Sequence, residues 1–154
     1  MRDDLLIFVR AHHWATVSTV SPSGHPQAAI VRIVVTDAFE LIFDTTDTTR
    51  KAANLRYNGK IAVVVGWEDN QTVQIEGVAD EPGGQELQSF RQFYSTLHPD
   101  YFRTRQGVKG LIYFRVSPKW MRYSDFRKNP ASVFTLDFAT GEENRVMVPF
   151  RSDV

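Results

Sequence analysis

The sequence predicts a mainly β protein of the α+β class, built as a small antiparallel barrel with two or three helices on its outside. Two observations carry this prediction. About six short segments are rich in β-branched and aromatic residues, and turn residues separate most of them at hairpin spacing. Two or three other segments have helical spacing. No repeat or linker divides the chain, so one domain over residues 1–154 is expected.

Composition narrows the classes of function. Lysine plus arginine and aspartate plus glutamate both number 18, so the net charge is zero. This balance argues against nucleic acid and against an anionic membrane surface as partners. No apolar stretch approaches the roughly 20 residues of a membrane span, and the N-terminus is too acidic for a signal peptide. With no cysteine, disulfides and thiolate sites are excluded, and a soluble cytoplasmic protein is expected.

The first part of the chain is predicted to be a short helix followed by a β-hairpin. Residues 3–13 place apolar side chains at helical spacing. Residues 14–20 and 27–36 have strand character, and the turn sequence SPSGHP separates them. The second strand has two faces, made by the alternating residues Ile30, Arg32 and Val34 and by Val31, Ile33 and Val35.

The middle of the chain alternates between strands and a helix. Residues 39–44 form a third strand that ends in a polar cluster, and residues 52–57 form a short helix stopped by Asn58-Gly59. Residues 60–67 are apolar on both faces, which predicts a central strand. Residues 72–79 alternate between apolar and polar side chains, as in a half-buried strand.

The remainder is predicted from its helical and strand patterns. Residues 85–98 form an amphipathic helix that Pro99 ends, and a mobile basic loop follows at 101–110. Residues 111–116 are a strand, and residues 119–123 continue it in extended form. After Asp125, two short apolar runs are expected as edge strands or a packed tail, at 133–134 and 146–148.

Two cations open the central helix. Aspartate and threonine precede Arg50 and Lys51, and both are good N-caps. The free N–H groups and positive dipole of a helix start favour an anion, so cations at this end indicate a negatively charged ligand such as a phosphate. Two solvated cations, or a pairing with Asp44 or Asp47, would explain the pattern equally well. No glycine-rich phosphate loop is present to decide between them.

No other cluster of residues indicates a catalytic or metal site. His12 and His13 are adjacent, so on a helix they do not face one another, and no metal site is expected. No nucleophile elbow of the G-x-S-x-G type occurs. No residue stands out as a general acid or base, and the catalytic residues are unknown at this stage.

The order of these segments resembles the pyridoxamine 5′-phosphate oxidase-like FMN-binding split-barrel family, over roughly residues 14–123. The resemblance rests on four pieces of sequence: ATVSTVSPSGHPQ, FDTTDTTRKAANLRYNGKIAVVVGW, TVQIEGVADE and YFRVSP. It implies a six-stranded antiparallel split β-barrel of Greek-key type. It further implies a homodimer with FMN bound in the cleft between the subunits, and a small-molecule substrate.

The resemblance also implies which residues bind the cofactor. Arg50 and Lys51 match the family's cations on the FMN phosphate, with Thr49 beside them. Asp44 and Thr45 match strand-end residues beside the flavin and its ribityl chain. The strand segment 29–34 matches the one along the flavin ring, and Thr72, or Gln71 beside it, matches a glutamine near the flavin. The expected cofactor-binding set is Ala29, Ile30, Val31, Arg32, Asp44, Thr45, Thr49, Arg50, Lys51, Thr72 and Gln74.

Several residues depart from the oxidase pattern. The oxidases carry arginine where this chain has Ala29 and lysine where it has Val34. Their C-terminal arginine and histidine for pyridoxal phosphate have no counterpart in residues 131–138. A substrate other than pyridoxamine 5′-phosphate is therefore expected.

The bound flavin itself is expected to carry out hydride or electron transfer, so the main expectation is an FMN-dependent oxidoreductase. Two alternatives stay open from the sequence. One is a deazaflavin in place of FMN, and the other is a non-enzymatic flavin- or haem-binding protein.

Overall fold

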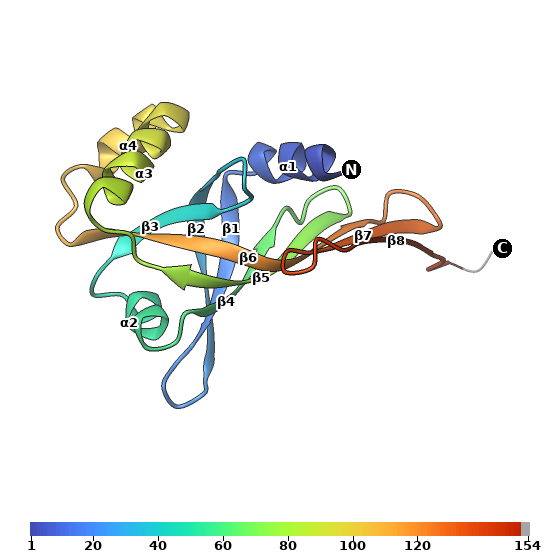
Figure 1. Cartoon of the computed structure of the whole chain (residues 1–154), viewed down its shortest axis with the longest axis horizontal. Coiled ribbons are helices and arrows are strands. Elements are labelled where there is room, and N and C mark those ends of the chain that lie inside the picture. The colour runs from blue at the N-terminus through green and yellow to red at the C-terminus, as the bar shows by residue number, and fades with distance from the viewer. Residues whose placement is uncertain (152–154) are drawn as a thin grey trace.

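The computed structural model describes residues 1–151 and contains four helices and eight strands (Figure 1). In chain order they are α1 (Arg2–Ala11), β1 (Trp14–Val20), β2 (Pro26–Val35), β3 (Leu41–Thr46), α2 (Arg50–Tyr57), β4 (Lys60–Val65), β5 (Gln71–Asp80), α3 (Gly84–Leu97), α4 (Pro99–Arg105), β6 (Leu111–Asp125), β7 (Ala131–Asp137) and β8 (Glu143–Val148). No helix in residues 1–151 is long and apolar enough to cross a membrane.

Six antiparallel strands close into a barrel, as the sequence predicts. The strand order is β3-β2-β1-β4-β5-β6, and pairing between β3 and β6 completes the ring. The chain makes this Greek-key crossover after β3, where α2 leads it across to β4 beside β1. β7 and β8 continue the sheet from β6, and Figure 1 shows this hairpin projecting away from the barrel. The two short apolar runs after Asp125 are thus confirmed as strands; β8 lies at the edge of the sheet, whereas β7 is paired on both sides.

The long strand β6 belongs to both parts of the sheet. Its first half pairs with β3 and its second half, Trp120–Asp125, pairs with β7. β5 runs along both halves, with a register shift between Glu76 and Gly77 opposite Pro118. A Cβ on Gly77 would lie 2.7 Å from the Ser117 carbonyl oxygen. Glycine is therefore required here because the two backbones approach closely at the bulge.

The barrel core follows the alternation read from the sequence. Val31, Ile33 and Val35 on β2 point inward and are at most 4% exposed. β4 and β5 contribute Ile61, Val63, Val65, Val73 and Ile75 to the same cluster. On the side of the barrel shown in Figure 1, α1 lies against one end, where its buried residues are Leu5 and Val9. Burial of these branched aliphatic side chains supplies the main stabilising term for the barrel.

A second, smaller core lies on the outside of the barrel. There α3 packs Tyr94 onto Val34, Ile42 and Tyr113 of β2, β3 and β6. Val34 is thus buried on the outer face of β2, while Ile30 on the same face is 65% exposed. The packing face predicted for residues 85–98 is confirmed in this contact.

Two local predictions differ from the structure. Residues 101–105 of the basic segment expected as a loop belong to α4, which begins at Pro99, and residues 106–110 lie outside the helix. Proline suits that position because its missing N–H would have no partner in the first turn. The third strand begins at Leu41, two residues later than predicted, because Phe39 lies in a turn with φ of 63°.

Candidate functional site

A cavity of about 300 Å³ lies between α2 and the far end of the β1–β2 hairpin. Figure 1 shows this hairpin extending past the barrel next to α2. The cavity is lined by Val17, Thr19, Gln27, Ala28, Ala29, Thr49, Arg50 and Lys51. The fold therefore brings four of the predicted site residues together: Ala29, Thr49, Arg50 and Lys51.

The start of α2 supplies donors to this cavity. Thr49 is the N-cap, and its Oγ1 accepts the N–H of Ala52 at 3.4 Å. In residues 1–151, no hydrogen bond engages the backbone N–H groups of Arg50 and Lys51, and no acidic residue occupies the first turn of the helix. The helix dipole and these N–H groups give the cavity a positive wall that suits an anion.

Lys51 is held inward rather than extended into solvent. Its Nζ donates to Thr45 Oγ1 at 3.3 Å, and Thr45 in turn lies 3.1 Å from Thr49 Oγ1. Within residues 1–151, neither Lys51 nor Arg50 forms a salt bridge, so the predicted pairings with Asp44 and Asp47 do not form. Burial lowers the pKa of the Lys51 ammonium below its ordinary value, which is the cost of a desolvated cation without an acidic partner.

A buried polar network forms the floor of the cavity. The Asn54 amide on α2 donates to Thr19 Oγ1 at 3.0 Å and to Gln27 Oε1 at 2.9 Å. These bonds join α2 to both strands of the hairpin and fix the width of the cavity. Sequence reasoning missed all three residues, although the alternation of residues 14–20 places Thr19 on the inward face with Val17.

The edge of β2 beside the cavity is open. In residues 1–151, β3 pairs with β6 along its whole length but with β2 only at Ile33–Val35. Ile33 N–H donates to the His13 carbonyl on the β1 side, at 2.9 Å. Because backbone groups alternate between the two edges of an antiparallel strand, Ile30 and Arg32 direct theirs to the open edge. A planar ligand can therefore meet backbone N–H groups along this part of β2.

Arg32 points away from the cavity, on the outer face of β2. Its guanidinium carbon lies 5.4 Å from the Trp14 ring centroid and 4.9 Å from that of Tyr101. Its Nη2 donates to His98 Nδ1 at 3.3 Å, while Nε is buried without a hydrogen-bond partner in residues 1–151. Arg32 is thus an aromatic-stacked cation beside the open edge, rather than part of the α2 cavity.

Asp44 also lies apart from the α2 cavity. Its buried carboxylate accepts from Arg105 Nε at 2.9 Å and from the Tyr101 hydroxyl at 3.4 Å, both on α4. Burial, and next the charge of Asp44, raise the pKa of Tyr101 above its ordinary value. Successive side chains of a strand point to opposite faces, so Asp44 meets α4 while Thr45 meets α2.

Thr72 and Gln74 lie on β5, with β1 and β4 between them and β2. Thr72 is opposite Ser124 of β6, and Gln74 is exposed opposite Val64 and Arg122. The single chain therefore does not bring them to the cavity beside α2.

Because Lys51 is partly buried without an acidic partner, its charge should lower the stability of the ligand-free protein. We expect Lys51→Met to raise the free energy of unfolding by about 0.5 kcal/mol, because it removes a desolvated charge and keeps the apolar stem. Urea unfolding of the ligand-free protein measures this difference. A loss of stability in Lys51→Met would show that the Thr45 bond outweighs the cost of burying the charge.

Comparison with known proteins identifies the family to which this chain belongs. A family model described as pyridoxamine 5′-phosphate oxidase matches residues 1–125. A pyridoxine/pyridoxamine 5′-phosphate oxidase of Bordetella avium is 36% identical over 76 residues, 49% of this chain. The chain spans 36% of that relative's length.

Solved structures share the fold at low identity. A pyridoxamine 5′-phosphate oxidase-related, FMN binding protein of Nostoc punctiforme has a TM-score of 0.67 at 15% identity, covering 96% of this chain and 91% of its own. A heme binding protein of Mycobacterium smegmatis has a TM-score of 0.68 at 14% identity, covering 92% of this chain and 56% of its own. From the extent of the family match, this chain belongs to the pyridoxamine 5′-phosphate oxidase family.

Proposed function

We propose that this chain is an FMN-dependent oxidoreductase that acts on a small molecule. The observation that carries the proposal is the anion-binding arrangement at the start of α2. Two side-chain cations and two free backbone N–H groups line one cavity, and no salt bridge in residues 1–151 neutralises the cations. A terminal phosphate suits such a site, because charge-assisted bonds to a helix N-terminus are strong.

The open edge of β2 supports a flavin in particular. The edge begins beside the cavity at Ala29 and continues towards Arg32, whose carbonyl accepts from the Tyr94 hydroxyl at 3.4 Å while its N–H stays available. The backbone N–H groups of Ile30 and Arg32 suit the carbonyl and nitrogen atoms of an isoalloxazine ring. The bound flavin would supply hydride or electron transfer, and the protein would orient the ring and shield it from water.

The position of Thr72 and Gln74 supports a homodimer in this proposal. Neither residue lines the α2 cavity of its own chain. Ile30 is 65% exposed and Trp14 is 46% exposed beside the open edge of β2, and both are apolar. A second copy that covers this edge would bury them and could bring its β5 residues to the flavin.

Reconstitution of the ligand-free protein distinguishes FMN from other cofactors. We expect saturable binding of FMN, seen as quenching of flavin fluorescence, and binding of riboflavin that is weaker by about a hundredfold because the phosphate is absent. The same titration with a deazaflavin and with haem tests the two alternatives. Equal affinity for FMN and riboflavin would overturn the assignment of the α2 cavity as a phosphate site. Tighter binding of deazaflavin or haem would show that this other cofactor, and not FMN, is the one bound.

A further inference from the structure

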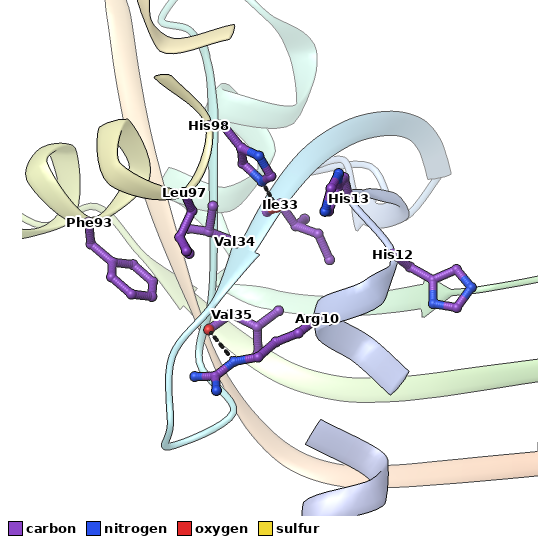
Figure 2. Close-up of a pocket in the computed structure, with 9 residues that line it drawn as sticks. All are labelled: Arg10, His12, His13, Ile33, Val34, Val35, Phe93, Leu97 and His98. Carbon is purple, nitrogen blue, oxygen red and sulfur yellow. Dashed lines mark hydrogen bonds between the residues drawn. The ribbon is translucent and has the colours of Figure 1, made fainter. Parts of the chain in front are cut away.

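A second cavity, of about 320 Å³, lies where the end of α1, the end of β2 and the helix α3 meet. Figure 2 shows the residues that line it: Arg10, His12, His13, Ile33, Val34, Val35, Phe93, Leu97 and His98. None of these residues lines the α2 cavity. The second cavity is therefore a separate site.

The walls of the second cavity are apolar. Val34, on the outer face of β2 and 3% exposed, forms one side of the cavity. Phe93 and Leu97 on α3 form the opposite side, as Figure 2 shows. Leu97 is 48% exposed, although it is an apolar residue next to a hollow. A ligand that entered here would bury an aliphatic or aromatic body against both walls.

A cation is fixed at the mouth of the cavity. Arg10 Nε donates to the Val35 carbonyl at 3.1 Å, the bond drawn in Figure 2, and its Nη2 contacts Asp37 at 2.6 Å. The side chain of Asp37 is 95% exposed, so water screens this ion pair and weakens it. The backbone bond holds the guanidinium in place, and a ligand anion can compete with Asp37 for its charge.

Of the two histidines next to Ile33, His98 is already fully bonded. A carbonyl can only accept, so the contact of 3.3 Å with the Ile33 oxygen requires a hydrogen on His98 Nε2. Arginine can only donate, so His98 Nδ1 accepts from Arg32. Burial, followed by the charges of Arg32 and His13, lowers the pKa of His98, in agreement with this neutral form.

His13 is the histidine that remains available to a ligand. It is exposed, its ring centroid lies 4.5 Å from that of His98, and Figure 2 shows it beside Ile33 at the cavity. No hydrogen bond engages its ring within residues 1–151. His13 and Arg10 both line the cavity, and Figure 2 shows them at different places, His13 beside Ile33 and the Arg10 guanidinium beside the Val35 carbonyl.

We propose that this second cavity binds a small apolar carboxylate. The apolar walls would hold the body of the ligand, and Arg10 would hold its carboxylate. The volume lies at the lower end of the range of about 300–1,000 Å³ typical of ligand cavities, which suits a molecule much smaller than a flavin nucleotide. The site does not depend on the cofactor proposed for the α2 cavity.

Titration with hexanoate tests this proposal directly. With the ¹⁵N-labelled full chain, we expect saturable shifts of the amide signals of Val34, Val35 and Leu97. 1-Hexanol has the same body without the charge, and we expect it to bind about fivefold more weakly, while hexylamine binds more weakly still. Equal binding of hexanoate and hexylamine, or no saturable shift at these residues, would overturn the proposal.

Two variants with matched controls locate the site. We expect Arg10→Gln to weaken hexanoate binding about fivefold, and Leu97→Glu to abolish it by placing a negative charge on the apolar wall. Arg103→Gln changes another arginine and Ile7→Glu changes another exposed aliphatic residue, both at helix positions outside the cavity, and both should leave binding unchanged. Unchanged binding in Arg10→Gln and Leu97→Glu, with the fold confirmed by the same spectra, would overturn the site.

Discussion

Replacing Arg50 and Lys51 together by alanine is expected to weaken FMN binding at least about a hundredfold. Each cation would make a charge-assisted contact to the phosphate, worth about 1.5–3 kcal/mol, so the pair loses about 3 kcal/mol or more. Arg50 is exposed and neither cation forms a salt bridge in residues 1–151, so the fold does not depend on them. Flavin fluorescence titration measures the affinity, and urea unfolding measures the stability of the same variant.

A matched pair of cations serves as the control for this experiment. Arg103 and Lys109 are exposed and lie outside the α2 cavity. Replacing both by alanine changes the net charge equally, so any general electrostatic effect on an anionic ligand appears in both variants. If FMN affinity falls equally in the two variants, or in neither, the assignment of the phosphate site to the start of α2 is wrong.

Replacing Asp44 by alanine is expected to lower the free energy of unfolding by about 2–3 kcal/mol. The side chain of Asp44 is 2% exposed, and its loss leaves Arg105 without its partner. Removing one partner of a buried pair costs about 3–5 kcal/mol, and the effect is smaller here because Arg105 is 26% exposed and can regain water. The pKa of Tyr101 should fall at the same time, since Asp44 is one of the causes that raise it.

Urea unfolding with a double-mutant cycle tests this role of Asp44. In Asp44→Ala combined with Arg105→Ala, the loss should be smaller than the sum of the two single losses. Asp100 pairs with Arg103 on the surface of the same helix, with side chains 88% and 74% exposed. Asp100→Ala should change the stability by less than about 0.5 kcal/mol. Additive losses in the cycle would show that Asp44 and Arg105 stabilise α4 independently.

The strands of the barrel could be predicted because one face of each is buried. Val31 and Ile33 alternate with the more exposed Ile30 and Arg32, and that pattern identifies the strand. α4 was missed because Pro99 ends a helix in one context and begins one in another. The sequence around Pro99 does not distinguish these cases, whereas the contact of Arg105 with Asp44, 61 residues away, does.

The candidate site was predictable where it lies in one continuous segment. Thr49, Arg50 and Lys51 are adjacent in the chain, so the capped helix start can be recognised locally. The network of Thr19, Gln27 and Asn54 joins three elements, and only the pairing of the strands brings these residues together. The open edge of β2 depends on the register with β3, which local sequence patterns do not specify.

The open edge of β2 has a consequence for how this fold tolerates substitution. Its donors belong to the backbone, so they persist whichever side chains occupy positions 28–32, provided that the strand register holds. Side chains there are then free to change the surface above the edge, as Arg32 does between Trp14 and Tyr101. The backbone donors of β2 that suit a planar ligand can therefore stay the same while the side chains that contact a second molecule change.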